Sequence, residues 1–193
     1  DITKQNNLKS TYFINMSKHT SKEFFRLNIA ILTLSDHRTP AEDSSGNLLL
    51  ALAQESGHTI RARALLKHNR YDIRACISDW IASQDIQVII INGGTGFSEG
   101  NCTPEAIRPL FDAEVEGFGE QFRQLSFTDI GSSSMQSRAL AGIANKTLIF
   151  AVPGSGGACR QAWEALIAPQ LDSRTGPCNF VAHVKNSPVN ACR

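Results

Sequence analysis

Residues 86–106 decide the fold, and they read IQVIIINGGTGFSEGNCTPEA. The run from Ile86 to Ile91 is rich in β-branched residues and has no polar alternation, a pattern typical of a parallel strand covered by helices on both faces. Gly93, Gly94 and Gly96 follow this run. Glycines can adopt a positive φ and bring backbone N–H groups close to an anion. The stretch therefore predicts a central strand followed by a ligand-binding loop.

A helix is expected directly after this loop. Thr103 suits the N-cap, Pro104 the first helical position and Glu105 the first turn. The apolar spacing that follows extends the predicted helix over residues 103–115. Because a helix N-terminus carries partial positive charge, the loop ends where an anion is favoured.

The Gly-Gly-Thr-Gly motif alone is a weak signal, because any tight turn from a strand to a helix can carry it. It is not a dinucleotide-binding fingerprint, since Glu99 stands where the third glycine is needed. It is not a P-loop either, because no Gly-Lys-Ser/Thr follows it. Nor does Gly154-Ser155-Gly156 match the G-x-S-x-G elbow of hydrolases. The rest of the chain has to decide between a ligand site and a plain turn.

Strand and helix patterns alternate along the rest of the chain. Strands are predicted at 28–34 and 59–66, helices at 47–55 and 69–83, and a hairpin at 138–143 and 147–152. A second glycine loop, from Pro153 to Gly157, opens a last helix. This order predicts an α/β fold, a three-layer α/β/α sandwich with a mostly parallel sheet and an antiparallel hairpin. Both glycine loops and the Ser35-Asp36 loop then lie at the carboxyl edge of the sheet, which favours a ligand site there.

Length and composition indicate one domain. The chain has 193 residues, of which 41% are hydrophobic and 19% charged, enough for a single buried core. We expect a flexible N-terminal extension over residues 1–26, one domain over 27–184 and a C-terminal tail over 185–193. Met16 resembles a natural start, which would leave 15 extra residues ahead of it.

Charge and cysteine usage exclude several classes of protein. A formal net charge of +1 argues against nucleic acid as a partner, and the absence of an apolar run long enough to span a bilayer argues against a membrane location. Five cysteines without a C-x-x-C pair argue against a disulfide framework or a zinc site, and favour the reducing cytoplasm. The five histidines lack ligand spacing, so no metal site is expected.

Seven motifs occur in a fixed order along residues 27–184: Ala30-Ile31-Leu32-Thr33-Leu34-Ser35-Asp36, Asp43-Ser44-Ser45-Gly46, Gly93-Gly94-Thr95-Gly96, Thr103-Pro104-Glu105-Ala106, Glu116-Gly117-Phe118-Gly119-Glu120, Ser137-Arg138 and Val152-Pro153-Gly154-Ser155. Taken together, these motifs resemble the MoaB/MogA family of molybdenum-cofactor biosynthesis proteins. Three further fragments, at 69–71, 98–100 and 177–180, are similar to the MoaB branch of that family.

This resemblance implies a molybdopterin-binding fold whose partner is molybdopterin or its precursor, in a homotrimer or homohexamer. Active relatives transfer adenylyl from Mg-ATP to the terminal phosphate of molybdopterin. No tightly bound cofactor is implied, and Mg and ATP are needed only if adenylyl transfer is retained. The ligand-binding positions that match the family are Ser35, Asp36, Gly93, Gly94, Thr95, Gly96, Thr103, Glu105, Ser137, Pro153, Gly154 and Ser155.

Two positions depart from the family pattern. Active adenylyltransferases of the family carry an aspartate five residues after the last glycine of the loop, where this chain has Asn101. A second family aspartate falls on His68. Carboxylates are strong magnesium ligands and their replacements carry no negative charge, so two functions stay open. The chain is either a molybdopterin adenylyltransferase with Asn101 and His68 at the catalytic positions, or a pterin-binding or assembly protein that lacks efficient transfer.

Overall fold

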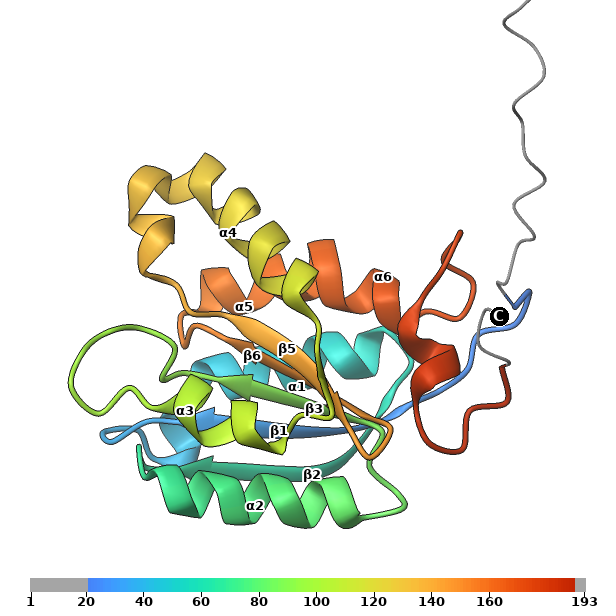
Figure 1. The fold of residues 1–193 in the computed structure, drawn as a ribbon, viewed down its shortest axis with the longest axis horizontal. Coiled ribbons are helices and arrows are strands. Elements are labelled where there is room, and N and C mark those ends of the chain that lie inside the picture. The colour runs from blue at the N-terminus through green and yellow to red at the C-terminus, as the bar shows by residue number, and fades with distance from the viewer. Residues whose placement is uncertain (1–20, 190–193) are drawn as a thin grey trace, which may run out of the picture.

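The computed structural model describes residues 21–189, which fold around a six-stranded sheet of order β2-β1-β3-β6-β5-β4 (Figure 1). The neighbours from β2 to β6 are parallel, whereas β5 runs antiparallel to β6 and to β4. The strands are β1 (Asn28–Leu34), β2 (Thr59–Leu66), β3 (Val88–Asn92), β4 (Ala113–Glu114), β5 (Leu140–Ala144) and β6 (Thr147–Val152).

Helices connect these strands, and polar side chains at their N-termini fix where several of them begin. Asp43, Asn69 and Ser155 each accept a hydrogen bond from a backbone N–H of the first turn that follows. The α-helices are α1 (Ser44–Glu55), α2 (Arg70–Ala82), α3 (Thr103–Ile107), α4 (Glu116–Ile130), α5 (Gly156–Ala162) and α6 (Ala168–Leu171). Shorter helical segments are η1 (Pro40–Glu42), η2 (Arg108–Leu110), η3 (Gly131–Gln136), η4 (Trp163–Ile167) and η5 (Phe180–His183).

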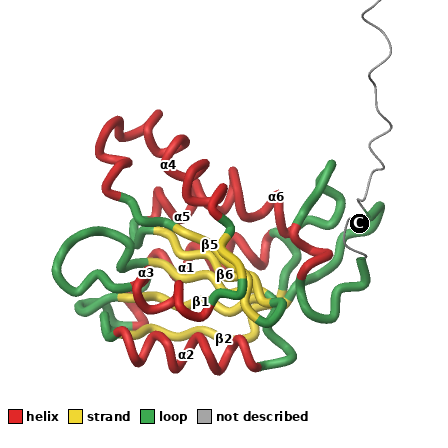
Figure 2. The backbone as a smooth tube through the Cα atoms, in the orientation of Figure 1, coloured by secondary structure: helices red, strands yellow, loops and turns green. Residues whose placement is uncertain are grey.

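Each face of the sheet is covered by its own hydrophobic core. Successive side chains of a strand point to opposite faces, so Ile31 joins one core and Leu32 the other. Helices α1, α4, α5 and α6 contribute to the first core, and α2 and α3 contribute to the second. Figure 2 shows the strands as a layer between these helices. The predicted three-layer sandwich with its antiparallel hairpin is thus confirmed.

The predicted helix over residues 103–115 is wrong in its length. The α-helix ends at Ile107, one 3₁₀ turn follows, and residues 113–114 form the edge strand β4. Pro109 lacks an N–H and its ring clashes with the preceding turn, which ends the helix. Arg74 of α2 then donates to the carbonyls of Glu105 and Ala106, at 2.8 and 3.1 Å, and so satisfies groups that the short helix leaves unpaired.

The ends of the described chain contact the domain. Ser21 N–H donates to the Ser173 carbonyl at 2.9 Å, and the Phe24 ring lies 5.2 Å from the His58 ring. Lys185 is buried, and its ammonium donates to the carbonyls of Ile81 and Ser83 at the end of α2. Ser21, Phe24 and Lys185 therefore contact the domain, and residues 1–20 of the extension expected over 1–26 lie outside the described residues.

Within residues 21–189, the helices are all too short or too polar to cross a bilayer.

Candidate functional site

Loops that are far apart in the sequence meet at the carboxyl edge of the parallel strands, at the end of the sheet where the β3–α3 loop projects (Figure 1). Gly93 N–H donates to the Val152 carbonyl at 2.9 Å, and a Cβ on Gly154 would lie 3.3 Å from the Gly93 Cα. At Gly93 itself, with φ of +104°, a Cβ would lie 2.4 Å from the Leu34 carbonyl oxygen. The loops after β1, β3 and β6 are thus in contact, as the sequence predicts.

Thr103 ties the start of the glycine loop to α3. Its hydroxyl donates to the Gly93 carbonyl at 2.8 Å, and its N–H donates to the Gly94 carbonyl at 3.1 Å. The predicted role of Thr103 as the N-cap is wrong, because Cys102 occupies that position and Thr103 is the first helical residue. Since its hydroxyl proton is already used, Thr103 shapes the loop.

Arg138, just before β5, ties down the next part of the loop. Its N–H donates to the Thr95 carbonyl at 2.9 Å, and its guanidinium donates to the Gly96 carbonyl through Nη2 at 2.6 Å and Nε at 3.1 Å. The four carbonyls from Gly93 to Gly96 are therefore all hydrogen-bonded within the protein.

The amides of the same peptide groups are free. In a trans peptide the carbonyl and the N–H of the next residue point in opposite directions. Carbonyls bonded within the protein therefore leave the N–H groups of Gly94, Thr95, Gly96 and Phe97 on the opposite side of each peptide, in a loop that passes from the buried Gly94 and Thr95 to the exposed Phe97. Among the described residues, none accepts a hydrogen bond from these four amides. Consecutive unpaired amides of this kind form a concave site for an anion.

Two serines of the neighbouring loops add hydroxyl groups. Ser35 Oγ accepts from the N–H groups of His37 and Arg38 at 3.3 and 3.1 Å, and Ser155 Oγ accepts from Ala158 N–H at 3.3 Å. A hydroxyl that accepts from the backbone keeps its own proton for donation. Both predicted serines can thus donate to a polar ligand at this edge.

The buried carboxylate of Asp43 lies at the N-terminus of α1 and accepts hydrogen bonds from three other residues. Asp43 accepts from Thr33 Oγ1 at 2.7 Å, from Arg63 at 2.9 Å and from Gly46 N–H at 2.9 Å. Burial would raise the pKa of Asp43, but these hydrogen bonds and the Arg63 charge outweigh it and leave the pKa below its ordinary value. Asp43 is therefore ionised and fixes the start of α1.

The same network reaches the second glycine loop. Asn92, the last residue of β3, is fully buried; its amide donates to Thr33 Oγ1 at 2.9 Å and accepts from Ser45 Oγ at 3.0 Å. Arg38 donates to Ser45 Oγ and, at 3.4 Å, to the Gly154 carbonyl. The guanidinium of Arg38 thereby brings a positive charge to the edge where the free amides lie.

The two positions that lack the family's aspartates lie beside the loop. A Cβ on Gly94 would lie 3.0 Å from His68 Nδ1, and one on Gly96 would lie 3.2 Å from Asn101 Nδ2. The Asp36 carboxylate accepts from His68 N–H at 3.0 Å. The predicted residues His68, Asn101 and Asp36 are thus gathered at one corner of the site.

This corner offers a magnesium ion one carboxylate, that of Asp36, beside the imidazole of His68 and the amide of Asn101. Within residues 21–189, no group of three or more His, Cys, Asp or Glu side chains is placed to hold a metal ion. An amide and an imidazole replace two of the anionic oxygen ligands that magnesium prefers. No step through a resident metal follows from this set of donors.

The remaining predicted residues have structural contacts. Pro153 accepts a weak hydrogen bond from the buried Cys159 thiol at 3.4 Å, and burial raises the pKa of that thiol to about 12, so it is not a nucleophile. Ser137 Oγ accepts from Ala139 N–H at 3.3 Å. Glu105 forms an ion pair with Arg138.

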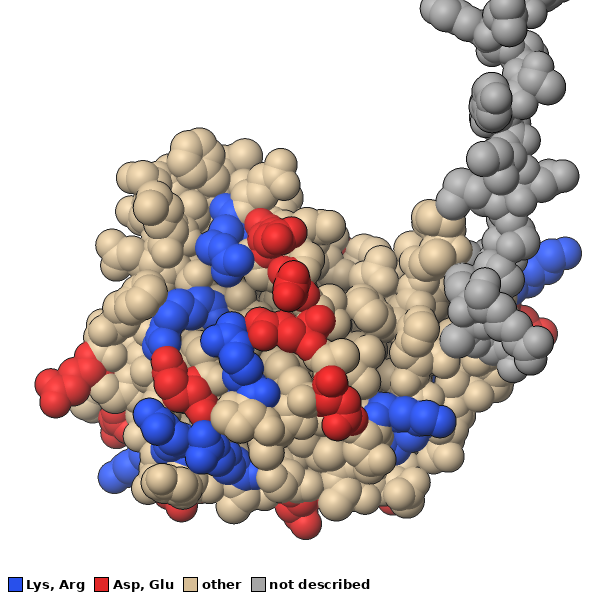
Figure 3. Space-filling view, viewed as in Figure 1, with Lys and Arg blue, Asp and Glu red and all other residues tan. Residues whose placement is uncertain are grey.

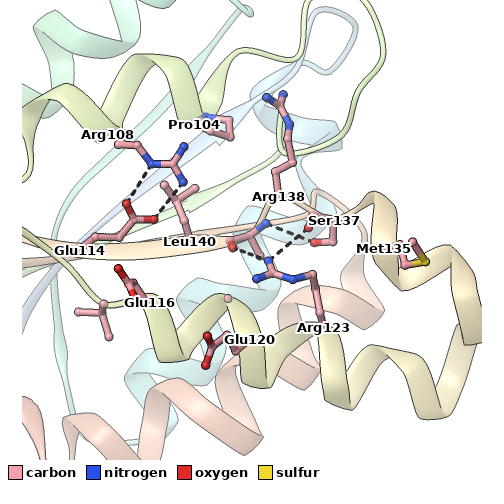
Figure 4. Close-up of a pocket in the computed structure, with 13 residues that line it drawn as sticks. Pro104, Arg108, Glu114, Glu116, Glu120, Arg123, Met135, Ser137, Arg138 and Leu140 are labelled. Carbon is pink, nitrogen blue, oxygen red and sulfur yellow. Dashed lines mark hydrogen bonds and ion pairs between the residues drawn. The ribbon is translucent and has the colours of Figure 1, made fainter.

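A cavity of 480 Å³ lies between α3, β5 and α4 (Figure 4), and Arg138, which holds the glycine loop, is among the residues that line it. Its walls carry both signs of charge, visible as adjoining blue and red side chains in Figure 3. Arg108 and Glu114 there are paired at 2.9 Å, and Arg123 donates to the carbonyls of Ser137 and Ala139. Ser137 is the one sequence-predicted site residue that lines it. The arginines of the cavity are already bonded to a carboxylate or to backbone carbonyls, and Glu116 and Glu120 add negative charge, so the edge with the free amides is the better anion site.

Arg138, Arg38 and Asn92 are site residues that the sequence does not identify as such. Their contacts join residues that are far apart in the chain. Arg138 and Gly96 are 42 positions apart, Arg38 and Gly154 are 116 apart, and Asn92 and Ser45 are 47 apart. The family motifs contain Arg138 and Ser45, and this was the sequence feature that could have identified them as site residues.

The chain matches a known protein family and named relatives. The family model for the probable molybdopterin binding domain matches residues 30–173. A protein from Escherichia coli (strain K12) named molybdenum cofactor biosynthesis protein B is 61% identical over 165 residues, covering 86% of this chain and 97% of that protein.

Solved structures of similar proteins share the fold. A crystal structure of molybdenum cofactor biosynthesis protein B has a TM-score of 0.74 at 40% identity, covering 76% of this chain and 92% of that one. The tungsten cofactor synthesizing protein MoaB from Pyrococcus furiosus has a TM-score of 0.66 at 28% identity, covering 72% of this chain and 89% of that one. The chain therefore belongs to the molybdopterin-binding domain family, among the relatives named molybdenum cofactor biosynthesis protein B.

Proposed function

We propose that this chain binds molybdopterin or its precursor by holding the terminal phosphate of the pterin on the free amides of residues 94–97. The observation that supports this is the orientation of the loop, whose carbonyls are all bonded within the protein while its amides are free. Phosphate groups are well suited to such amides and to the hydroxyls of Ser35 and Ser155. Family membership supplies the class of ligand.

We further propose that adenylyl transfer from ATP to this phosphate is slow. Such transfers depend on positioning and on a divalent cation that neutralises developing charge. Asn101 and His68 provide no anionic ligand for that cation. Glu99 and Glu105 are other acids close to Asn101 in the sequence, and Glu105 is already paired with Arg138. This favours the pterin-binding or assembly function over the adenylyltransferase function.

Calorimetric titration of the purified protein with molybdopterin, with and without Mg-ATP, tests both parts. We expect saturable binding without nucleotide, and little release of pyrophosphate when Mg-ATP is added. Absence of binding would refute the ligand assignment. Rapid, repeated pyrophosphate release would refute slow transfer and establish the enzyme.

We propose a homotrimer or homohexamer in the cytoplasm, supported by family membership and by free rather than paired cysteines at positions 76, 102 and 159. A monomeric mass by light scattering at micromolar protein concentration would contradict the oligomer.

A further inference from the structure

Arg138 makes contacts to both ends of the exposed turn of the glycine loop. Its guanidinium donates to the Gly96 carbonyl at 2.6 and 3.1 Å and to the Asn101 carbonyl at 3.1 Å. Its backbone N–H donates to the Thr95 carbonyl at 2.9 Å. One residue just before β5 thus holds three carbonyls of a loop that precedes it by about 40 positions.

Two side chains of that region hold the guanidinium in place. Glu105, in the first turn of α3, forms an ion pair with it, and the Phe97 ring lies 4.9 Å from its Cζ atom. Burial would raise the pKa of Glu105, but hydrogen bonds from its own backbone N–H and from Arg138, with the charges of Arg138 and Arg70, outweigh it and keep the pKa below its ordinary value. Glu105 is therefore an anion fixed against Arg138.

We infer that Arg138 is a positioning residue that orients the amides of Gly96 and Phe97 for the phosphate. The guanidinium holds the Gly96 carbonyl, which belongs to the same peptide group as the Phe97 N–H. The backbone N–H of Arg138 holds the Thr95 carbonyl, which belongs to the same peptide group as the Gly96 N–H. Thr103 does the same for the amides of Gly94 and Thr95 through the preceding two carbonyls. Substitution of Arg138 keeps the backbone bond to Thr95 but removes the guanidinium from the Gly96 and Asn101 carbonyls, so the Phe97 amide loses its fixed orientation and the amides of Gly94 and Thr95 keep theirs. The inference rests on the proposed function for its binding readout.

The planar, forked guanidinium is required for this role. It reaches two carbonyls that are five residues apart and keeps a third donor for Glu105. A lysine ammonium has the charge but lacks the fixed fork, so it cannot hold all three acceptors in the same geometry. Arg138→Lys is thus a partial loss, and Arg138→Gln a full one.

The test compares Arg138→Gln and Arg138→Lys with Arg108→Gln, which removes a paired arginine that does not touch the loop. Molybdopterin binding by calorimetry should weaken at least about tenfold in Arg138→Gln, less in Arg138→Lys and less than about twofold in Arg108→Gln. A Kd within twofold of the parent protein in Arg138→Gln would overturn the inference. If that variant does not fold, Arg138→Lys decides by the same criterion.

A second readout needs no ligand. Backbone NMR resonances of Gly96 and Phe97 should move in Arg138→Gln, and the Asn101 amide, bonded to Ser98 at 3.0 Å, should exchange with solvent faster. Arg108→Gln should leave these signals unchanged. If the parent protein binds no molybdopterin, the proposed function fails, and the NMR comparison still decides whether Arg138 orients the loop; unchanged signals in Arg138→Gln would overturn that role.

Discussion

Gly94→Ala is expected to destabilise the protein and damage its ligand site together. Gly94 has a φ of +69°, a region that costs an alanine about 1–2 kcal/mol. The added Cβ would lie 2.3 Å from Thr103 Oγ1, so the Thr103 hydroxyl must leave the Gly93 carbonyl. Leaving that buried acceptor unpaired costs about 1–3 kcal/mol more. The expected loss of unfolding free energy is about 3 kcal/mol.

Urea denaturation of the purified variant measures this loss, with Gly117→Ala as the control. A Cβ on Gly117, near the start of α4, meets no atom within 4 Å. Alanine is the better helix former, so the control should change the unfolding free energy by less than about 1 kcal/mol and in the stabilising direction. If the two variants have equal stability, or if Gly94→Ala keeps the molybdopterin affinity of the parent, the geometry assigned to the loop is incorrect.

Three further predictions concern other parts of the chain. Burial lowers the pKa of His58 from 6.5 to about 4, so its contribution to stability is complete above pH 6.5 and is lost as the pH falls toward 4. The loss should reach about 3 kcal/mol in wild-type urea denaturation and be largely absent in His58→Gln; identical pH profiles would refute it. Asn101→Asp combined with His68→Asp should increase pyrophosphate release with Mg-ATP and molybdopterin, and no gain would show that missing metal ligands are not the cause. Lys185→Met should reduce the unfolding free energy by about 2 kcal/mol, because two carbonyls at the end of α2 lose a charged donor; a change below about 0.5 kcal/mol would contradict this.

Elements with a strong local pattern could be predicted well from the sequence. The bounds of β1 and β2 agree residue for residue with the predicted ranges 28–34 and 59–66. Their apolar residues and the flanking turn residues act within a few positions of each other, so a single sequence contains the needed information. The parallel direction of neighbouring strands then follows from the helices that connect them.

Elements that depend on distant contacts could not be predicted. The apolar spacing beyond Ile107 favours a helix, but Pro109 breaks it and residues 113–114 pair with β5 instead. Thr103 has the right residue type for an N-cap, yet its hydroxyl bonds to Gly93 because the loop folds back over it. In both cases tertiary contacts outweigh the local preference.

In the candidate site, too, features set by local sequence could be predicted and features set by distant contacts could not. The glycines could be identified because positive φ and close packing demand that residue type at Gly93 and Gly94. Arg138 could not, because its role depends on carbonyls about 40 residues away. Sequence indicates where a ligand can approach the backbone, and tertiary structure decides which way the amides point.

Backbone NMR titration with molybdopterin tests the central claim most directly, because it reports on each amide separately. The account predicts that the largest shifts fall on the amides of Gly94, Thr95, Gly96 and Phe97, and that the amides of Arg108, Glu114 and Glu120 in the neighbouring cavity stay unchanged. Binding with unshifted loop amides, or with its shifts confined to that cavity, would contradict the account.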